Sequence, residues 1–514
     1  MGESVLRAYR ERVKPAWKLA FFSVLVIGLI AHLYKFTNTL LNHDALYHVY
    51  ATQNTVAIGR WFLMVACWPS TFFDLPWITG LFSLFWIGLT AAVIVDLFEV
   101  RNPVAVVLTG GLLVTFPCIV NTFFFQYAAD GYMLAMFLAA LAVRLATVGD
   151  ASWKHTIAAL LLICFSCGIY QAYVSFALLL SMCHFMWELL LDRHERRAYG
   201  RWIVRQLVVY GGGLLAYWLA WRLCMVLEHV SAADYQGIGE LGALGPAAIL
   251  LAVKQTATTV ARFFLGGDLR TWGLSLYAAM NLVFLAGTAV VLIAAAVRTG
   301  VFRDGLRLLL MVLSLLVIPV FACMWSFASP SVVYHMLMLQ SLSTLYIFSV
   351  LLFERYCRPR TSTAAALFFA LLVLKFVLQA NACYFEMDKC MERSRETATE
   401  MLTRIHELDD GSVKYIAFTG GGDESLVAAG AGEIGEILVH AHQLRRGLLY
   451  DNIYAPLYLR NVLGSRYIAV DAETLQRLEE SGVTDDMNDW PLRDSVKVVD
   501  DLVIVRLPAP AGGA

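Results

Sequence analysis

The sequence predicts an α-helical polytopic membrane protein of about eleven transmembrane helices that ends in a small α/β domain. Of the 514 residues, 59% are hydrophobic, and the mean hydropathy of +0.65 lies far above that of soluble globular domains. Apolar runs of membrane length recur as far as residue 383. Beyond residue 385 the chain is charged and shows the alternation typical of β-strands, which indicates a separate soluble domain.

Eleven apolar runs meet or approach the roughly 20 residues that a helix needs to cross a bilayer. The runs cover 17–36, 76–97, 103–122, 128–147, 156–169, 171–191, 203–228, 276–297, 306–327, 333–353 and 363–383. The fifth run is short and shares one apolar stretch with the sixth, so ten or twelve spans are the alternatives.

The distribution of Lys and Arg over the short loops predicts a cytoplasmic N-terminus, because positive residues concentrate on that side of a membrane. Loops expected inside hold basic clusters such as DRHERRAYGR at 192–201. The opposing connections, NTFFFQYAAD at 121–130 and ASPSVVYH at 328–335, hold no Lys or Arg. With eleven spans, everything after the last span lies on the outer side.

The chain divides into two predicted domains. Residues 1–385 form the transmembrane domain, with two long outer loops at 37–75 and 229–275, and residues 386–514 form a soluble extracytoplasmic α/β domain. The second domain carries a helical candidate at 387–408 and the strand-like patterns YIAFTG, SRYIAVD and KVVDDLVIVRL. It has no Cys beyond Cys390, so we expect it to fold by packing alone, without disulfides.

Composition excludes several classes of ligand. The net charge of −1, without a concentrated basic surface, argues against nucleic acid as a partner. No P-loop or Rossmann glycine pattern occurs, so a nucleotide-sugar donor is not expected. No cofactor is expected either. A divalent metal held by His43, Asp44 and His48 is an alternative, although the H-E-x-x-H spacing is absent.

The stretch LLNHDALYHVYATQNTVAIGRW at 40–61 gathers charged residues directly after the first apolar run. Near-helical spacing predicts an interfacial helix in which Asp44 and His48 share one face, beside His43. A partly dehydrated carboxylate can act as a general base, and a guanidinium such as that of Arg60 can bind phosphate through two hydrogen bonds. We expect this carboxylate and this guanidinium to share one pocket at the membrane surface, and the alternative for Asp44 is a solvated surface carboxylate.

Further candidates lie at the outer ends of other runs. Asp130 is a functional candidate because charges at a membrane edge are costly, with helix capping as the alternative. Tyr170 and Gln171 occupy a tight outer turn and are either site residues or interfacial anchors. The same choice between the site and anchoring or solvation applies to three more residues: Arg262, Asp268 and His335.

The order of these features resembles that of the Gtr-type, serotype-converting O-antigen glucosyltransferases, which belong to the GT-C class of polytopic membrane glycosyltransferases. The matching features are Asp44, the GRW at 59–61, NTFFFQYAADGYML ending beyond Asp130, and GIYQAY at 168–173. The resemblance covers about residues 15–385. The family often has an acidic pair where this chain has His43 and Asp44.

The resemblance implies an inverting transferase in the bacterial inner membrane. Such enzymes take a sugar, here expected to be glucose, from a polyprenyl-phosphate carrier and add it to a lipid-linked O-antigen-type glycan of lipopolysaccharide on the periplasmic face. Asp44 is then the expected base and Asp130 a second catalytic candidate. The expected substrate-binding residues are Arg60, His43, His48, Tyr170, Gln171, Arg262, Asp268 and His335.

Two other classes of protein are alternatives. A flippase or transporter of lipid-linked sugars requires polar residues at the bilayer midplane and related repeats, whereas the polar candidates here gather at one face. A scaffold would use its outer domain to bind other envelope components. Membrane lipids are expected partners in every case.

Overall fold

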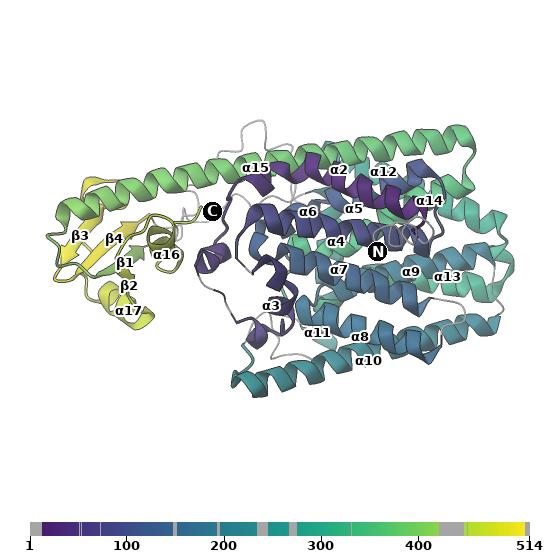
Figure 1. Cartoon of the computed structure of the whole chain (residues 1–514), viewed down its shortest axis with the longest axis horizontal. Coiled ribbons are helices and arrows are strands. Elements are labelled where there is room, and N and C mark those ends of the chain that lie inside the picture. The colour runs from purple at the N-terminus through teal and green to yellow at the C-terminus, as the bar shows by residue number, and fades with distance from the viewer. Residues whose placement is uncertain are drawn as a thin grey trace, which may run out of the picture.

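The computed structural model describes residues 13–508 apart from short gaps, and it has two parts, a helical bundle and a small α/β domain (Figure 1). The residues outside the description are 1–12, 51, 53, 72, 148–151, 193–195, 234–244, 267–274, 330–331, 421–446, 450 and 509–514.

The bundle confirms the predicted class of fold. Among the described residues, ten helices are long and apolar enough to cross a membrane, or up to eleven if one bent pair counts as a single span. The ten are α2 (Pro15–Thr37), α4 (Pro76–Leu97), α7 (Gln126–Ala146), α9 (Tyr173–Leu191), α10 (Arg196–Glu228), α11 (Pro246–Leu265), α12 (Leu276–Arg298), α13 (Gly305–Ala322), the segment Met336–Tyr356 that contains α14 (Ser343–Tyr356), and α15 (Pro359–Leu408). The bent pair is α5 (Pro103–Thr115) and α6 (Pro117–Phe124), and α8 (Trp153–Ile169) is a shorter apolar helix.

Proline explains where several of these helices begin and where one run bends. Pro lies in the first turn of α2, α4, α5, α6, α11 and α15, where its missing N–H is no loss. The run predicted at 103–122 breaks at Phe116, which precedes Pro117 and is extended at ψ 138°. The two halves, α5 and α6, meet at a bend of 40°.

The helices differ from the predicted segments in two places. The expected outer loop at 229–275 contains α11, whose Lys254 and Arg262 interrupt the apolar pattern and obscured it. The expected domain boundary at 385/386 falls inside α15, a continuous helix of 50 residues. The predicted number of spans agrees with the structure partly because two differences cancel. α11 was not predicted, and the predicted run at 156–169 is α8, whose 17 residues are too few to count as a span.

The two ends of the bundle differ. At one end, Asp96 at the end of α4 accepts hydrogen bonds from Lys14, Trp17 and Arg144, the last at 2.8 Å. The other end carries the segment between α2 and α4, folded as η1 (Asp44–His48), η2 (Val56–Ile58), α3 (Leu63–Ala66) and η3 (Trp68–Ser70). This segment lies on the side of the bundle that faces the C-terminal domain (Figure 1).

The C-terminal domain contains a four-stranded sheet in the order β2-β1-β4-β3. Its strands are β1 (Tyr415–Gly420), β2 (Ile468–Ala469), β3 (Val496–Val499) and β4 (Leu502–Leu507), with helices α16 (Tyr454–Asn461) and α17 (Ala472–Glu480). β1 is parallel to β2 and β4, and β3 is antiparallel to β4. The strands fall in the three predicted patterns, which confirms them.

All ten Cys are free.

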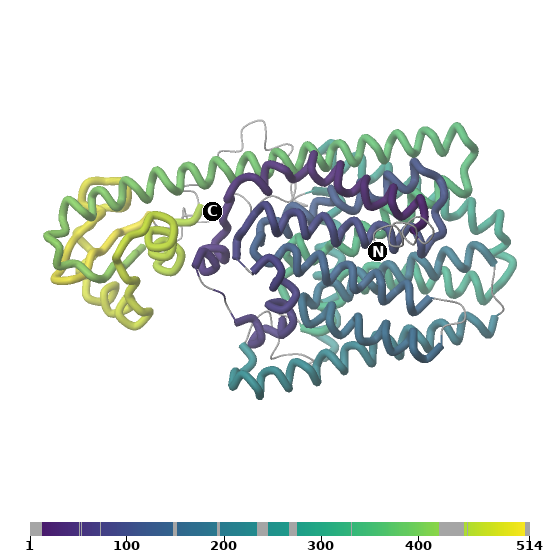
Figure 2. Tube along the Cα trace, in the orientation of Figure 1, coloured from purple at the N-terminus to yellow at the C-terminus, as the bar shows by residue number. Residues whose placement is uncertain are grey.

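The long helix α15 runs from the bundle to the sheet and connects the two parts (Figure 2). Asp409, directly after α15, accepts hydrogen bonds from the Tyr467 hydroxyl at 2.8 Å and the Gly411 N–H at 2.8 Å, and it pairs with Arg466. Burial alone would raise the pKa of Asp409, but these donors outweigh it and hold the pKa well below its usual value. The carboxylate therefore ties the sheet to the end of the helix.

Candidate active site

A largely apolar cavity lies between α10, the α8–α9 turn and the segment that precedes α14. It encloses about 820 Å³ of open space, part of which is continuous with solvent. Four of the residues predicted from sequence line it, namely Arg60, Tyr170, Gln171 and His335. The rest of the wall is mainly aromatic or apolar and includes Tyr217, Trp218, Trp221, Trp325, Ile58, Val332 and Met338.

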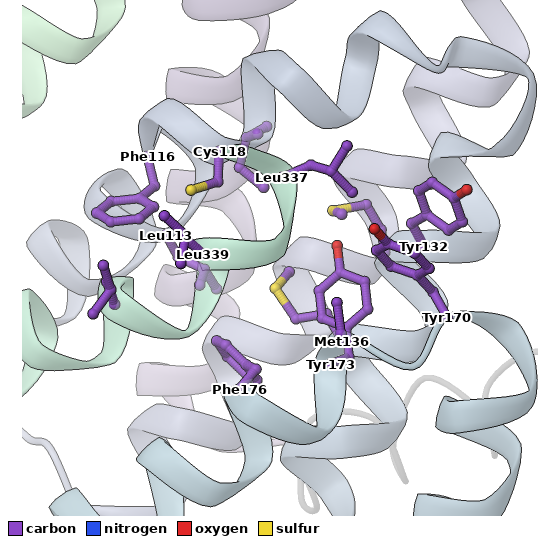
Figure 3. Packing of buried hydrophobic residues seen from close by; sticks show 14 of the residues in the cluster. Leu113, Phe116, Cys118, Tyr132, Met136, Tyr170, Tyr173, Phe176, Leu337 and Leu339 are labelled. Atoms are coloured by element: carbon purple, nitrogen blue, oxygen red, sulfur yellow. The ribbon is translucent and has the colours of Figure 1, made fainter. Parts of the chain in front are cut away.

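Two tyrosines hold Arg60 at the cavity wall. Its Nη1 donates a hydrogen bond to the Tyr132 hydroxyl at 3.0 Å, and the guanidinium lies 4.8 Å from the centre of the Tyr170 ring. The two rings are stacked, with 4.6 Å between their centroids. Figure 3 shows the two side chains beside one another. A guanidinium over aromatic faces gains cation–π stabilisation.

The backbone of the GRW turn is fixed by side chains from α10 and from the α8–α9 turn. Gly59 has φ +82°, and its carbonyl accepts from the Tyr217 hydroxyl at 3.1 Å. The Gln171 side chain donates to the Ile58 carbonyl at 3.1 Å, and the Trp221 indole donates to the Val56 carbonyl at 2.7 Å. These hydrogen bonds fix the backbone from which the Arg60 side chain extends.

Asp44 lies on η1, a 3₁₀-helix of five residues at the same end of the bundle. Its side chain is 38% exposed and its carboxylate lies 3.5 Å from Nε2 of His43. Asp44 is not among the residues that line the cavity of Arg60. Arg60 lines this cavity and Asp44 does not, so the cavity does not bring the two side chains into one pocket as expected.

The two histidines of the stretch pack on the aromatic turn between α6 and α7. The ring of His43 lies 6.2 Å from that of Phe124, and His48 stacks on Tyr127 at 3.9 Å. His48 is buried, and burial lowers its pKa to about 4. The described residues hold no group of three His, Cys, Asp or Glu side chains arranged to bind a metal.

Asp130 is buried in α7, only 2% exposed, near Cys67 and Ser70. The helix is preceded by Phe125 at its N-cap and begins at Gln126, so the alternative that Asp130 caps it is wrong. Among the described atoms, its Oδ1 has no hydrogen-bond partner. Burying a carboxylate oxygen without a hydrogen bond costs free energy of folding. Asp130 therefore remains a functional candidate.

The remaining predictions have mixed outcomes. Arg262 is exposed in the last turn of α11 and does not line the cavity. Asp268 lies outside the described residues. His335 reaches the cavity directly before the 3₁₀-helix η7 (Met336–Leu342).

Sequence reasoning missed several residues of the site. Tyr132, Tyr217 and Trp221 lie inside apolar runs, where aromatic residues carry no distinguishing signal. The spacing of four between Tyr217 and Trp221 could have marked one face of a helix. A second missed feature is Asp74, just before α4, whose two carboxylate oxygens are buried and whose pKa is raised by burial despite the nearby charge of Lys35.

The fold and the cavity define a polytopic membrane protein with a candidate site at one end of its helical bundle. Residues 33–244 match the family described as glucosyl transferase GtrII, which confirms the resemblance drawn from the sequence. The matched region contains Asp44, Arg60, Asp130, Tyr170 and Gln171, whereas His335 and the C-terminal domain lie outside it. No curated protein and no solved structure matches the chain.

Replacing Gly59 by Ala should destabilise the protein by about 1–3 kcal/mol, because a side chain resists a positive φ. The added Cβ would also lie 2.5 Å from both the Gln171 amide nitrogen and the Tyr217 hydroxyl. The midpoint of thermal unfolding in detergent measures the effect. Gly211→Ala on α10 is the matched control, since nothing lies within 4 Å of its Cβ, and an equal midpoint for both variants would contradict the prediction.

Stability should depend on pH through His48. Above pH 6.5 the ring is neutral in both folded and unfolded chains, so it contributes nothing. Between pH 6.5 and about 4 the unfolded chain binds a proton that the folded chain does not, which removes about 3 kcal/mol as the pH falls. His48→Gln should flatten this part of the profile of unfolding midpoint against pH, whereas the exposed His229→Gln should leave it unchanged.

Proposed function

We propose that this chain is an inverting membrane glycosyltransferase of the GT-C class. It moves a sugar, taken to be glucose, from a polyprenyl-phosphate carrier to a lipid-linked, O-antigen-type glycan of lipopolysaccharide. The observation that carries the proposal is one guanidinium, that of Arg60, held by two tyrosines at the wall of a tryptophan-lined cavity. The family match to glucosyl transferases supports the transfer of a glycosyl group.

The cavity suits a donor with a charged head and an apolar tail. Arg60 can bind the phosphate through two parallel hydrogen bonds, with Gln171 and His335 as further polar groups on the same wall. The indoles of Trp218, Trp221 and Trp325 offer apolar surface for the isoprenoid.

In the proposed step, the acceptor hydroxyl attacks the anomeric carbon from the face opposite the phosphate. The new C–O bond forms as the bond to the phosphate oxygen breaks, polyprenyl phosphate leaves, and the hydroxyl proton passes to Asp44. Arg60 stabilises the charge that develops on the departing phosphate. Because Asp44 lies apart from the wall that Arg60 lines, the acceptor is proposed to enter from the side of the C-terminal domain.

The proposed location is the bacterial inner membrane, with a cytoplasmic N-terminus and a periplasmic C-terminal domain. The clustered Lys and Arg of the short loops support this orientation. The start of α2 and the sheet also lie at opposite ends of the molecule (Figure 1), as an odd number of crossings requires.

Arg60→Lys should raise the donor KM by roughly 10- to 100-fold, because Lys keeps the charge but loses the bidentate, stacked geometry. The assay follows radiolabelled glucose from polyprenyl-phosphate glucose to a lipid-linked glycan with the purified protein in detergent. A transporter would not transfer sugar in detergent, where no membrane separates two compartments. Arg201→Ala, exposed near the opposite end of α10, is the control, and an unchanged KM for Arg60→Lys would remove Arg60 from the donor site.

Asp44→Asn should lower kcat by about 10²- to 10⁴-fold, the usual contribution of a general base, and leave the donor KM nearly unchanged. The same assay measures both constants. Retained kcat in this variant, at normal expression, would show that the base lies elsewhere, and Asp130→Asn would then be the next variant.

A further inference from the structure

The C-terminal domain touches the helix that carries Asp44. The Nδ2 group of Asn461, the last residue of α16, donates a hydrogen bond to the Leu46 carbonyl of η1 at 2.8 Å. The ring of Tyr454, the first residue of α16, lies 5.3 Å from that of His43 and 6.2 Å from that of Tyr47. Both ends of α16 therefore contact the five-residue helix that holds Asp44.

η1 depends on such contacts for its shape. A single 3₁₀ turn has poor internal hydrogen-bond geometry and little stability of its own. On one side it packs on the aromatic turn of the bundle, through His43 on Phe124 and His48 on Tyr127. On the other side it meets α16, so η1 lies between the membrane domain and the soluble domain.

α16 is itself held rigidly to the sheet. Asp451 accepts hydrogen bonds from the backbone N–H groups of Ile453 and Tyr454, which fixes the first turn of the helix. The side chain of Asn452 accepts from the Phe418 N–H of β1 at 2.9 Å and donates to the Val470 carbonyl. The sheet in turn is anchored at the end of α15 through Asp409.

We propose that Asn461 and Tyr454 are positioning residues for glycosyl transfer. They fix η1, and so place the Asp44 carboxylate against the acceptor hydroxyl. The C-terminal domain is then a part of the catalytic apparatus, and the acceptor site lies at the joint between the two domains. This inference rests on the proposed function, in which Asp44 is the base.

The test compares four variants of the full chain in the transfer assay from polyprenyl-phosphate glucose. Asn461→Ala, which removes one hydrogen bond, should lower kcat about tenfold. Tyr454→Ala should lower kcat about 10²-fold, because small displacements of a reacting group cost that much. Tyr454→Phe keeps the ring and should restore kcat to within about twofold. Arg460→Ala, an exposed neighbour on α16, is the control and should equal the parent protein.

A change in kcat without a change in the donor KM distinguishes a loss of positioning from a general loss of structure. The donor KM should stay within about twofold in all four variants, because none of the residues that line the cavity of Arg60 comes from α16. The midpoint of thermal unfolding should stay close to that of the control. If Tyr454→Ala does not fold, the kcat of Asn461→Ala alone tests the inference. Normal kcat in Asn461→Ala and Tyr454→Ala, or a loss confined to the donor KM, overturns the inference.

The outcome for Asp44→Asn distinguishes the two proposals. If Asp44→Asn loses kcat while Asn461→Ala and Tyr454→Ala do not, the positioning role alone fails. If Asp44→Asn keeps its kcat, the base assignment fails and the positioning role fails with it.

Discussion

The site depends on how the protein keeps a guanidinium at the wall of an apolar cavity. Removing a cation from water is expensive unless hydrogen bonds and nearby π-electrons compensate. Here Tyr132 accepts a hydrogen bond from Arg60 and Tyr170 lies under its plane. Those tyrosines come from α7 and the α8–α9 turn, so three separate parts of the chain must assemble before the charge is tolerated. The cavity therefore forms only in the folded bundle.

The same constraint explains the local backbone. The Arg60 side chain can meet both rings only if the chain turns sharply just before it, and Gly59 supplies the positive φ for that turn. Donors from Gln171, Tyr217 and Trp221 then satisfy carbonyls that the turn leaves outside regular structure. Buried polar groups and backbone geometry thus support one another around one charged residue.

Hydropathy and alternation predicted most of the architecture, because burial in lipid and burial in a sheet leave direct periodic signals. They failed where the signal is mixed. α11 carries Lys254 and Arg262 among apolar residues, and α15 passes from the membrane into water without a Gly or Pro inside it to mark the change. Chemical reasoning found Arg60, Tyr170, Gln171 and His335 from their place at the ends of apolar runs. It did not find Tyr132 or Tyr217, whose hydrogen bonds to Arg60 and Gly59 form only when the helices pack together. Nor could it find the contact between Asn461 and Leu46, whose partners lie far apart in the sequence.

The unbroken course of α15 has a mechanical consequence. A helix of 50 residues is about 75 Å long, more than twice the roughly 30 Å of a hydrocarbon core, so much of it projects as a stiff lever. Because α15 is unbroken between the bundle and the sheet, a change in its tilt relative to the bundle would displace the sheet and load the contact between α16 and η1.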